Sequence, residues 1–260
     1  MGLKKYLISI EACDSPRLNT FFSQSLFSSA AHEFKTFGIK GAELTVKEYF
    51  DQAVAGHSKP LTPGELGCTL SHLAALRDFL DSDKSYAVVF EDDAIQDGNF
   101  CFAQIESELH RLALEPGFFL SLGGIQLVHS QKVKGRFIEN KMLGRSVLKV
   151  HPYYYSKFAS AYAYVVDRKM AEILLHYHEV PKIFDHWNGI AQMNSQIHLY
   201  ATYLFDHPPV INAEGSYLEK ERLMNSQQAS QEVAKEPLFQ PLKKSIVKLF
   251  LKSYDTNFKN

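Results

Sequence analysis

The sequence predicts an α/β fold in which a mainly parallel central sheet carries helices on both faces. Two observations favour it: short apolar stretches with the length of buried strands recur along the 260 residues, and segments with helical periodicity separate them. Strands that alternate with helices are typical of parallel sheets. We expect residues 1–225 to form this domain, and residues 226–260 to form a polar tether and a basic amphipathic C-terminal helix.

The clearest single element is a helix that begins at Pro63. Thr62 is expected to be its N-cap, and Glu65 the third helical residue that completes a capping box. Asp167 is expected to cap a later helix. In chain order, the other expected elements are strands at 5–10, 86–90, 117–124, 160–166 and 196–205, and helices at 17–34, 46–54, 99–114 and 168–178.

Composition argues against several classes of protein. A net charge of −1 argues against a dedicated nucleic-acid-binding protein, which is usually strongly basic. Cys13, Cys68 and Cys101 lie far apart without a CxxC pair, which argues against a disulfide framework and a zinc site. The apolar N-terminal stretch is too short for a signal peptide, and no stretch approaches the roughly 18 apolar residues of a membrane span. We therefore expect a cytoplasmic protein.

The stretch YAVVFEDDAI, residues 86–95, places three acids directly after a buried strand. Packing does not favour Glu91, Asp92 and Asp93 together, because carboxylates repel one another and each costs several kcal/mol to bury unpaired. In such sheets ligands bind outside the carboxyl ends of the strands, and oxygen ligands suit magnesium or manganese with a diphosphate. The alternative is a solvated junction that caps a following helix.

The acidic run is part of a longer block with several motifs. Residues 61–95, LTPGELGCTLSHLAALRDFLDSDKSYAVVFEDDAI, contain a TPGE-G turn, SH on the following helix and an apolar strand closed by EDD. This combination resembles glycosyltransferase family 25, which contains bacterial lipopolysaccharide and lipooligosaccharide glycosyltransferases and relatives that galactosylate animal collagen. The resemblance extends to AYAYVVDRKMAEILL and PKIFDHW, and covers about residues 4–215. It departs near the N-terminus, where SIEACDSPR replaces an NL-x-R segment.

The resemblance implies a GT-A fold, in which an acidic strand end holds a divalent metal on a sugar nucleotide. It further implies manganese or magnesium as cofactor, UDP-galactose as donor and transfer to an acceptor hydroxyl with inversion. Glu91, Asp93 and His207 are the expected metal residues, with Asp93 the first choice. The expected nucleotide-sugar contacts are Ile10, Arg17, Glu65, Ser71, His72, Glu91 and Asp92.

The acceptor side is expected in the segment PKIFDHW. A carboxylate bound to metal does not readily accept a proton, so the catalytic base is expected elsewhere. Asp185 matches the Pro-x-x-Asp element of the family, and the resemblance therefore implies that it is the base. Trp187, with its neighbour His186, is expected to contact the acceptor, because sugars pack on aromatic rings. The alternatives are that Asp185 caps a short helix and that Trp187 is an ordinary core residue. In the same way, Glu65 can be only a capping residue, and His72 only a satisfied core histidine.

The C-terminal stretch is basic. Lys244, Lys248 and Lys252 recur every four residues and would share one face of a helix. Such a helix is typical of an anchor on anionic lipid, so residues 237–260 are expected to contact the cytoplasmic face of the bacterial inner membrane. This fits a lipid-linked oligosaccharide acceptor. The alternative is a helix docked on the protein body with its lysines in solvent.

Two other functions stay open at this point. Acids at a strand end also suit metal-dependent phosphoryl or nucleotidyl transfer, although the sequence has no P-loop. A non-catalytic glycan- or nucleotide-binding module would be expected to lack the acidic run or Asp185, and both are present. We therefore favour a metal-dependent, inverting hexosyltransferase.

Overall fold

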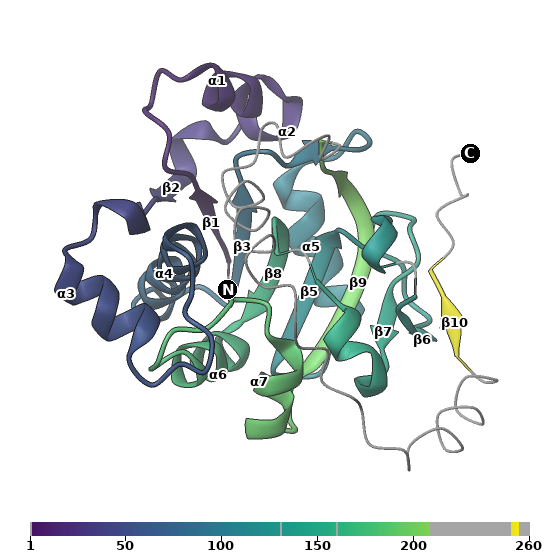
Figure 1. Cartoon of the computed structure of the whole chain (residues 1–260). Coiled ribbons are helices and arrows are strands. Elements are labelled where there is room, and N and C mark those ends of the chain that lie inside the picture. The colour runs from purple at the N-terminus through teal and green to yellow at the C-terminus, as the bar shows by residue number, and fades with distance from the viewer. Residues whose placement is uncertain (1, 131, 160, 209–250, 255–260) are drawn as a thin grey trace, which may run out of the picture.

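The computed structural model describes residues 2–130, 132–159, 161–208 and 251–254 of the chain. One central sheet runs through the molecule, and helices lie on both of its faces (Figure 1). The α/β class expected from the sequence is confirmed.

The elements agree with most of the expected ranges. The helical piece expected at 46–54 is a short α-helix that continues as a π-helix, and further helical turns are 3-10 segments. The strands are β1 (Leu3–Ile8), β2 (Phe34–Phe37), β3 (Tyr86–Glu91), β4 (Ile95–Gln96), β5 (Phe118–Gly123), β6 (Lys134–Phe137), β7 (Leu148–Val150), β8 (Ala163–Asp167), β9 (His198–Asp206) and β10 (Lys252–Ser253). The helices are α1 (Pro16–Ser23), α2 (Ser25–Ser28), α3 (Val46–Tyr49), the π-helix Phe50–Val54, α4 (Pro63–Leu80), α5 (Phe102–Leu112), α6 (Arg168–Tyr177) and α7 (Trp187–Met193).

The sheet contains both parallel and antiparallel pairs. Its order is β10-β6-β7-β9-β5-β8-β3-β1-β2, with β4 beside the end of β9. Strands β2, β1, β3, β5 and β9 run in one direction, whereas β8 runs against its neighbours β3 and β5. A parallel pair needs a crossover connection, which is usually helical. Strand β8 is preceded by the β6–β7 hairpin and a 3-10 turn, so no α-helical crossover leads into it. The sheet is therefore less parallel than the alternation of strands and helices in the sequence predicted.

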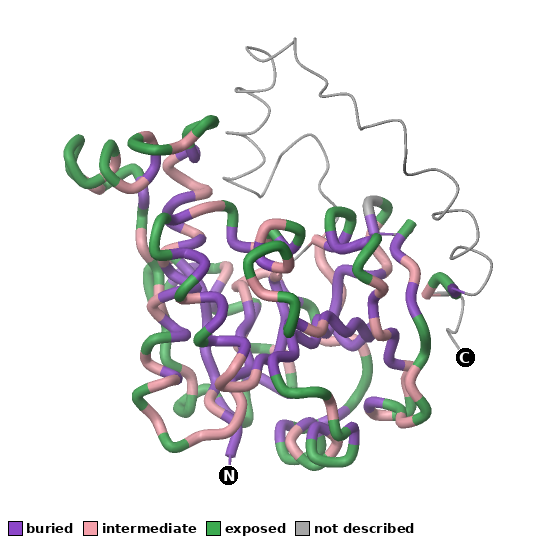
Figure 2. Tube along the Cα trace, turned by 90° about the horizontal axis from the view of Figure 1, so that it is seen from below, coloured by how far each residue is buried: buried purple, intermediate pink, exposed green. Residues whose placement is uncertain are grey.

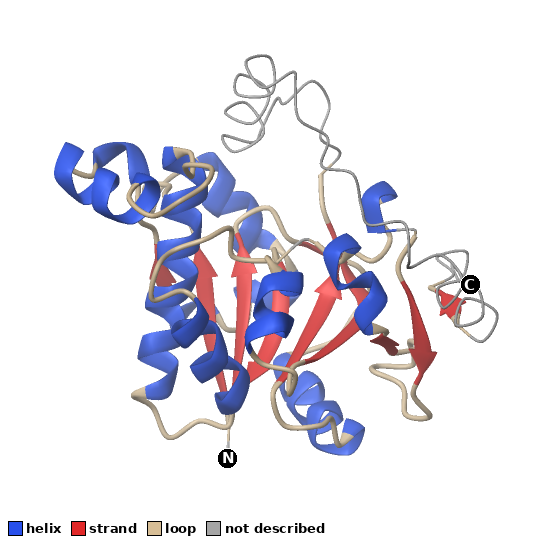
Figure 3. Cartoon of the chain, turned by 60° about the horizontal axis from the view of Figure 1, so that its bottom comes forward, coloured by secondary structure: helices blue, strands red, loops and turns tan. Residues whose placement is uncertain are grey.

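The hydrophobic core lies on both faces of the sheet, as β3 illustrates. Val89 packs into the cluster on one face, and Val88 and Phe90 pack into the cluster on the other, because side chains alternate along a strand. Helices α4, α6 and α7 cover the first face, and α1, α2 and α5 cover the second. Buried residues concentrate along the central strands and exposed ones at the periphery (Figure 2), and the layers are visible in Figure 3. Only the two ends of β3 are less than fully buried.

The two helix caps predicted from the sequence are present. The Thr62 hydroxyl accepts a hydrogen bond from the Glu65 N–H at 3.1 Å, and the Glu65 carboxylate accepts one from the Thr62 N–H at 3.0 Å. Asp167 caps α6 by accepting a hydrogen bond from the Met170 N–H at 2.8 Å. The capping box of α4 fixes the start of a helix whose first turns border the pocket described below.

The segment expected as one helix at 17–34 is divided instead. Helix α1 begins after its cap Ser15 and ends at Ser23, because the next residue, Gln24, is extended. The Gln24 side chain donates to the carbonyl of Ala94 and accepts from the N–H of Gln96, just beyond the acidic run. These tertiary hydrogen bonds hold the break between α1 and α2, and the chain then forms β2.

The predicted C-terminal helix is wrong at Lys252 and Ser253, which form the edge strand β10 beside β6. Leu251 is buried in the core, and the Tyr254 ring lies 6.0 Å from that of Phe137. Packing against the edge of the sheet therefore outweighs the helical periodicity here. The rest of the predicted tether and helix lies outside the described residues. In the described part of the chain, no helix is both long and apolar enough to cross a membrane.

Replacing Thr62 with alanine should lower the free energy of unfolding by about 1–2 kcal/mol, because the N-cap of α4 loses its acceptor. Urea denaturation followed by circular dichroism measures the change. Thr45→Ala is the matched control: it removes the same type of capping box from α3, which has no buried residue. The control should cost less stability, and equal losses would contradict the importance of the α4 cap.

Candidate active site

A pocket of about 270 Å³ opens where β1 and β3 end side by side. The two strands are parallel neighbours with Ile8 opposite Glu91, so the chain leaves both at the same edge of the sheet. Residues 8–11 line one wall of the pocket, and the acidic run 91–93 lines the next. Arg17, at the start of α1, completes this side. The position agrees with the rule that ligands bind beyond the carboxyl ends of strands.

The opposite wall is the segment 39–43, packed closely against α4. A Cβ atom on Gly41 would lie 1.9 Å from a carbonyl oxygen of α4, and one on Gly67 would lie 2.4 Å from the carbonyl oxygen of Ile39. The Ser71 hydroxyl accepts a hydrogen bond from the Ile39 N–H at 2.8 Å and donates to the Gly67 carbonyl at 2.7 Å. The sequence did not predict this wall. Gly41 and Gly67 were the residues that could have indicated close packing here.

Asp92 is held by two neighbours within the protein. The Ser9 hydroxyl donates to one carboxylate oxygen, and Nε of Arg17 donates to the other. Burial raises the pKa of Asp92, and the nearby charge of Asp93 adds to this, although Ser9 and Arg17 oppose it. Both oxygens of Asp92 therefore already have partners, and Asp92 serves to position Arg17.

Asp93 has one oxygen with partners and one without. Its Oδ2 accepts a hydrogen bond from Arg17 at 2.9 Å and lies 3.3 Å from Nε2 of His207. Its Oδ1 is buried and has no hydrogen-bond partner among the described residues. Burial alone would raise the pKa of Asp93, but the hydrogen bond and charge of His207 and the charge of Arg17 lower it. A buried, charged carboxylate oxygen without a partner fits a hard divalent cation.

His207 reaches the acidic run from the end of β9. Its Nδ1 lies 2.7 Å from the carbonyl oxygen of Pro208, and its Nε2 faces the carboxylate of Asp93. Both partners are hydrogen-bond acceptors, so both contacts are hydrogen bonds when the ring is an imidazolium, which carries a proton on each nitrogen. Burial lowers the pKa of His207, but the hydrogen bond and charge of Asp93 outweigh it and the pKa is raised. In this state His207 balances the charge of Asp93.

Glu91 points to a different neighbour from Asp93. His72 is completely buried, its Nε2 lies 3.4 Å from Oε1 of Glu91, and its Nδ1 lies 2.9 Å from the Tyr164 hydroxyl. The His72 ring also stacks on Phe184 with the centroids 4.3 Å apart. His72 is thus both a buried core histidine and a direct neighbour of the acidic run.

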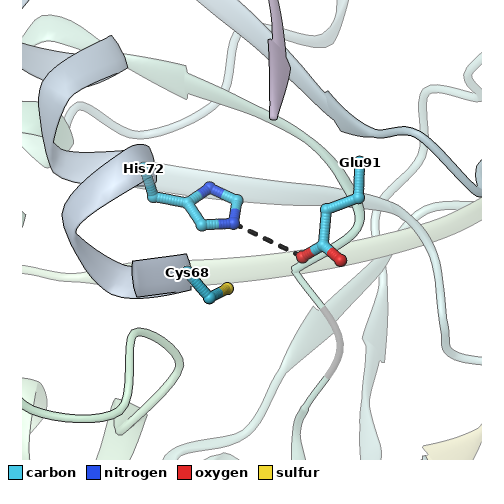
Figure 4. Close-up of side chains that lie close together, drawn as sticks. All are labelled: Cys68, His72 and Glu91. Atoms are coloured by element: carbon cyan, nitrogen blue, oxygen red, sulfur yellow. Dashed lines mark hydrogen bonds and ion pairs between the residues drawn. The ribbon is translucent and has the colours of Figure 1, made fainter. Parts of the chain in front are cut away.

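The expected metal set of Glu91, Asp93 and His207 does not form one cluster in the described residues. The three-residue cluster with suitable ligand atoms is instead Cys68, His72 and Glu91, drawn in Figure 4. Glu91 is the last residue of β3 and lies toward α4, whereas Asp93 comes after the strand and lies toward Arg17 and His207.

The other predicted donor-side residues are also placed by the structure. Glu65 is in the capping box and does not line the pocket, and the Ser71 hydroxyl is used by backbone groups. Ser9, Lys40 and Cys68 line the pocket although the sequence analysis did not select them. The predicted residues that do line the pocket are Ile10, Arg17, Ser71, Glu91, Asp92 and Asp93.

The acceptor prediction for Trp187 is wrong, because its side chain is only 2% exposed and packs 4.4 Å from the Phe119 ring. His186 is exposed, and its Nδ1 lies 2.6 Å from the Tyr177 hydroxyl. Asp185 is half-buried and is not the N-cap of α7, a position that His186 occupies. None of these three residues lines the pocket.

The sequence of this chain matches a known family over most of its length. Residues 3–187 match glycosyltransferase family 25, described as LPS biosynthesis protein. The chain belongs to glycosyltransferase family 25. It is therefore a glycosyltransferase with a role in lipopolysaccharide biosynthesis. No curated protein matches the sequence. Among solved structures, the chain is similar to mannose-1-phosphate geranyltransferase from Thermus thermophilus, with 12% identity, a TM-score of 0.44, and 81% of this chain and 76% of that chain covered.

Replacing Asp93 with asparagine should lower the pKa of His207, because burial of the ring remains while the carboxylate is lost. Histidine NMR titration of the metal-free glycosyltransferase measures this change. His151, whose pKa is lowered by burial and by the charge of Arg136, is the internal control, and its pKa should not change. An unchanged pKa of His207 would show that the contact with Asp93 does not form.

The same pair sets the direction of a pH effect on stability. The raised pKa of His207 means that its contribution is complete below its ordinary pKa of about 6.5 and is lost as pH rises through the raised value. The lowered pKa of Asp93 means that its contribution is present above its ordinary pKa and is lost as pH falls through the lowered value. His207→Gln should therefore lower the free energy of unfolding most at pH values between the ordinary pKa of an aspartate and the ordinary pKa of a histidine. Urea denaturation at several pH values measures this loss.

Proposed function

We propose that this family 25 glycosyltransferase uses a divalent cation to transfer galactose from UDP-galactose, with inversion, to a lipid-linked oligosaccharide. The observation that carries the proposal is the buried Oδ1 of Asp93, which lacks a partner among the described residues and lies at a pocket beyond β1 and β3. The GT-A type of nucleotide site implied by the sequence resemblance agrees with this position. Family membership supports the reaction class and an acceptor in lipopolysaccharide biosynthesis.

Manganese or magnesium fits the ligands at this position. Hard cations of this kind are commonly held by one or two carboxylates, with substrate phosphates and water supplying the remaining oxygens. Asp93 would hold the cation, because Asp92 is occupied by Ser9 and Arg17. His207 would need to lose its Nε2 proton to become a ligand, and as an imidazolium it instead balances charge. A bound cation would neutralise the diphosphate leaving group.

The remaining pocket walls suit a nucleotide. Ile10 is 39% exposed although it is apolar, and it lines the pocket together with Ile39, so a base or ribose has an apolar surface to cover. Arg17 and Lys40 also line the pocket, but both already pair with carboxylates of the same lining. A bound cation would supply the positive charge that a diphosphate needs.

We assign proton abstraction from the acceptor hydroxyl to Asp185. Its loop is fixed on α4 by two contacts: the Thr69 hydroxyl donates to the Lys182 carbonyl at 2.9 Å, and Phe184 stacks on His72. Asp185 therefore follows a residue that packs directly behind the acidic run. A carboxylate here is separate from the one proposed to hold the cation, so it can accept a proton while the cation stays bound.

We further propose that residues 237–260 contact anionic lipid on the cytoplasmic face of the inner membrane. Residues 241–260 contain five lysines and one aspartate, a charge balance that favours binding to such a surface. Lys252 is exposed in β10. Contact with the membrane would bring the protein to the surface that carries a lipid-linked acceptor.

Asp93→Asn should weaken manganese-dependent binding of UDP by roughly 10–100-fold or more, since even supporting residues of metal sites have effects of this size. Isothermal titration of UDP with and without manganese measures the loss. Asp97→Asn is the matched control, because Asp97 pairs with Arg145 and does not line the pocket. Equal UDP affinity in the Asp93 variant and the unmodified chain would overturn the assignment.

Asp185→Asn should leave UDP binding intact and reduce transfer by about 10²–10⁴-fold, the usual contribution of a positioned base. Product formation from UDP-galactose on a truncated lipooligosaccharide acceptor, at saturating donor, measures the effect on kcat. Full activity in this variant would remove Asp185 as the base. No transfer by the unmodified chain, together with normal UDP binding, would favour a non-catalytic module.

A further inference from the structure

Beside the acidic run lies a group of side chains that donor binding as proposed above does not use. Cys68 and His72 come from α4 and Glu91 from the end of β3, and one ligand atom of each lies within 4.8 Å of the others. Figure 4 shows the three side chains converging on one point. We propose that Cys68, His72 and Glu91 form a zinc site at the inner wall of the pocket. This proposal does not rest on the proposed donor or reaction.

The kinds of ligand separate this site from the one proposed at Asp93. A thiolate and an imidazole favour zinc over magnesium or manganese, which prefer oxygen ligands. Cys68 is not in a disulfide. The absence of a CxxC pair argues only against zinc sites built on paired cysteines. Here the second ligand is a histidine four residues along the same helix, and the third comes from a strand.

The distance between the His72 and Glu91 ligand atoms matches that of a zinc site. Residues four apart in a helix project from the same face, so Cys68 and His72 are neighbours on α4. Nε2 of His72 and Oε1 of Glu91 are 3.4 Å apart, which is long for a hydrogen bond. Two ligands of a tetrahedral zinc ion, each bonded at about 2.0–2.1 Å, are separated by about 3.3–3.4 Å. The observed separation therefore suits a shared cation better than a direct hydrogen bond.

The second nitrogen of His72 is oriented as zinc binding requires. Nδ1 lies 2.9 Å from the hydroxyl of Tyr164, which is fully buried. Burial raises the pKa of Tyr164, so the phenol stays neutral and its oxygen can accept a hydrogen bond from Nδ1. In the tautomer that carries its proton on Nδ1, the lone pair is on Nε2, which faces Glu91. Histidine ligands of metals commonly use the other ring nitrogen in this way.

Three protein ligands leave one position of a tetrahedral zinc ion open, as in catalytic sites. Cys68 and Glu91 both line the pocket, whereas His72 is buried behind them. The open position therefore faces the pocket, where water or an anionic group of a bound molecule can occupy it. Occupancy would also neutralise Glu91 without involving Asp93.

Titration of the reduced, metal-free full chain with Co²⁺, in the absence of nucleotide, tests the site. One equivalent should produce the charge-transfer absorption of a cobalt–thiolate bond, and Zn²⁺ should abolish it by displacement, even with excess Mg²⁺. Cys68→Ser should lose this absorption and weaken Co²⁺ binding by more than about 100-fold. Cys101→Ser, which removes an exposed cysteine at the start of α5, is the matched control and should keep both.

Two further variants complete the test. Glu91→Gln should weaken Co²⁺ binding while circular dichroism shows an unchanged fold. Asp93→Asn should keep the cobalt–thiolate absorption even though it is expected to lose manganese-dependent UDP binding, so failure of one site is distinguishable from failure of the other. No thiolate absorption in the unmodified chain, or absorption that persists in Cys68→Ser, would overturn the proposal.

Discussion

The parallel pairing of β1 with β3 is the constraint on which the rest of the site depends. It places Ser9 and the acidic run at one edge of the sheet, and Ser9 then binds Asp92 directly. The residues that precede the acids are buried on both faces of the sheet, so packing holds the end of β3, and the carboxylates that follow it, at the pocket. A shift in register of one residue would turn Val88, Val89 and Phe90 toward the wrong faces, so packing fixes the register strongly.

Charge balance at this edge is reached with cations from distant parts of the chain. Arg17 contacts both aspartates from α1, and His207 contacts Asp93 from beyond β9. Two cations beside two buried anions lower the cost of desolvation, and their fixed positions prepare the pocket for a charged ligand. Among the described residues, Oδ1 of Asp93 still has no hydrogen-bond partner. Glu91 belongs to a second group with softer ligands on α4, so the two proposed cations would lie on different sides of the acidic run.

Local signals in the sequence were sufficient for the caps at Thr62 and Asp167 and for the buried strand before the acids. Arg17 was expected from the family resemblance as a nucleotide contact, and its pairing with the two aspartates was not predicted. Features set by tertiary packing were not predictable in this way. Trp187 is in the core because Phe119 and the other rings of that face surround it, and the sequence alone did not decide between this position and an acceptor contact. Likewise, the group Cys68, His72 and Glu91 forms only when α4 packs over the end of β3.

The most direct test of the central claim is a crystal structure with UDP and manganese, using anomalous diffraction to locate the metal. The account predicts a manganese peak bonded to Oδ1 of Asp93 and to the diphosphate, in the pocket between the acidic run and segment 39–43. Nucleotide bound in the pocket without manganese at Asp93, or manganese and UDP bound elsewhere, would contradict it.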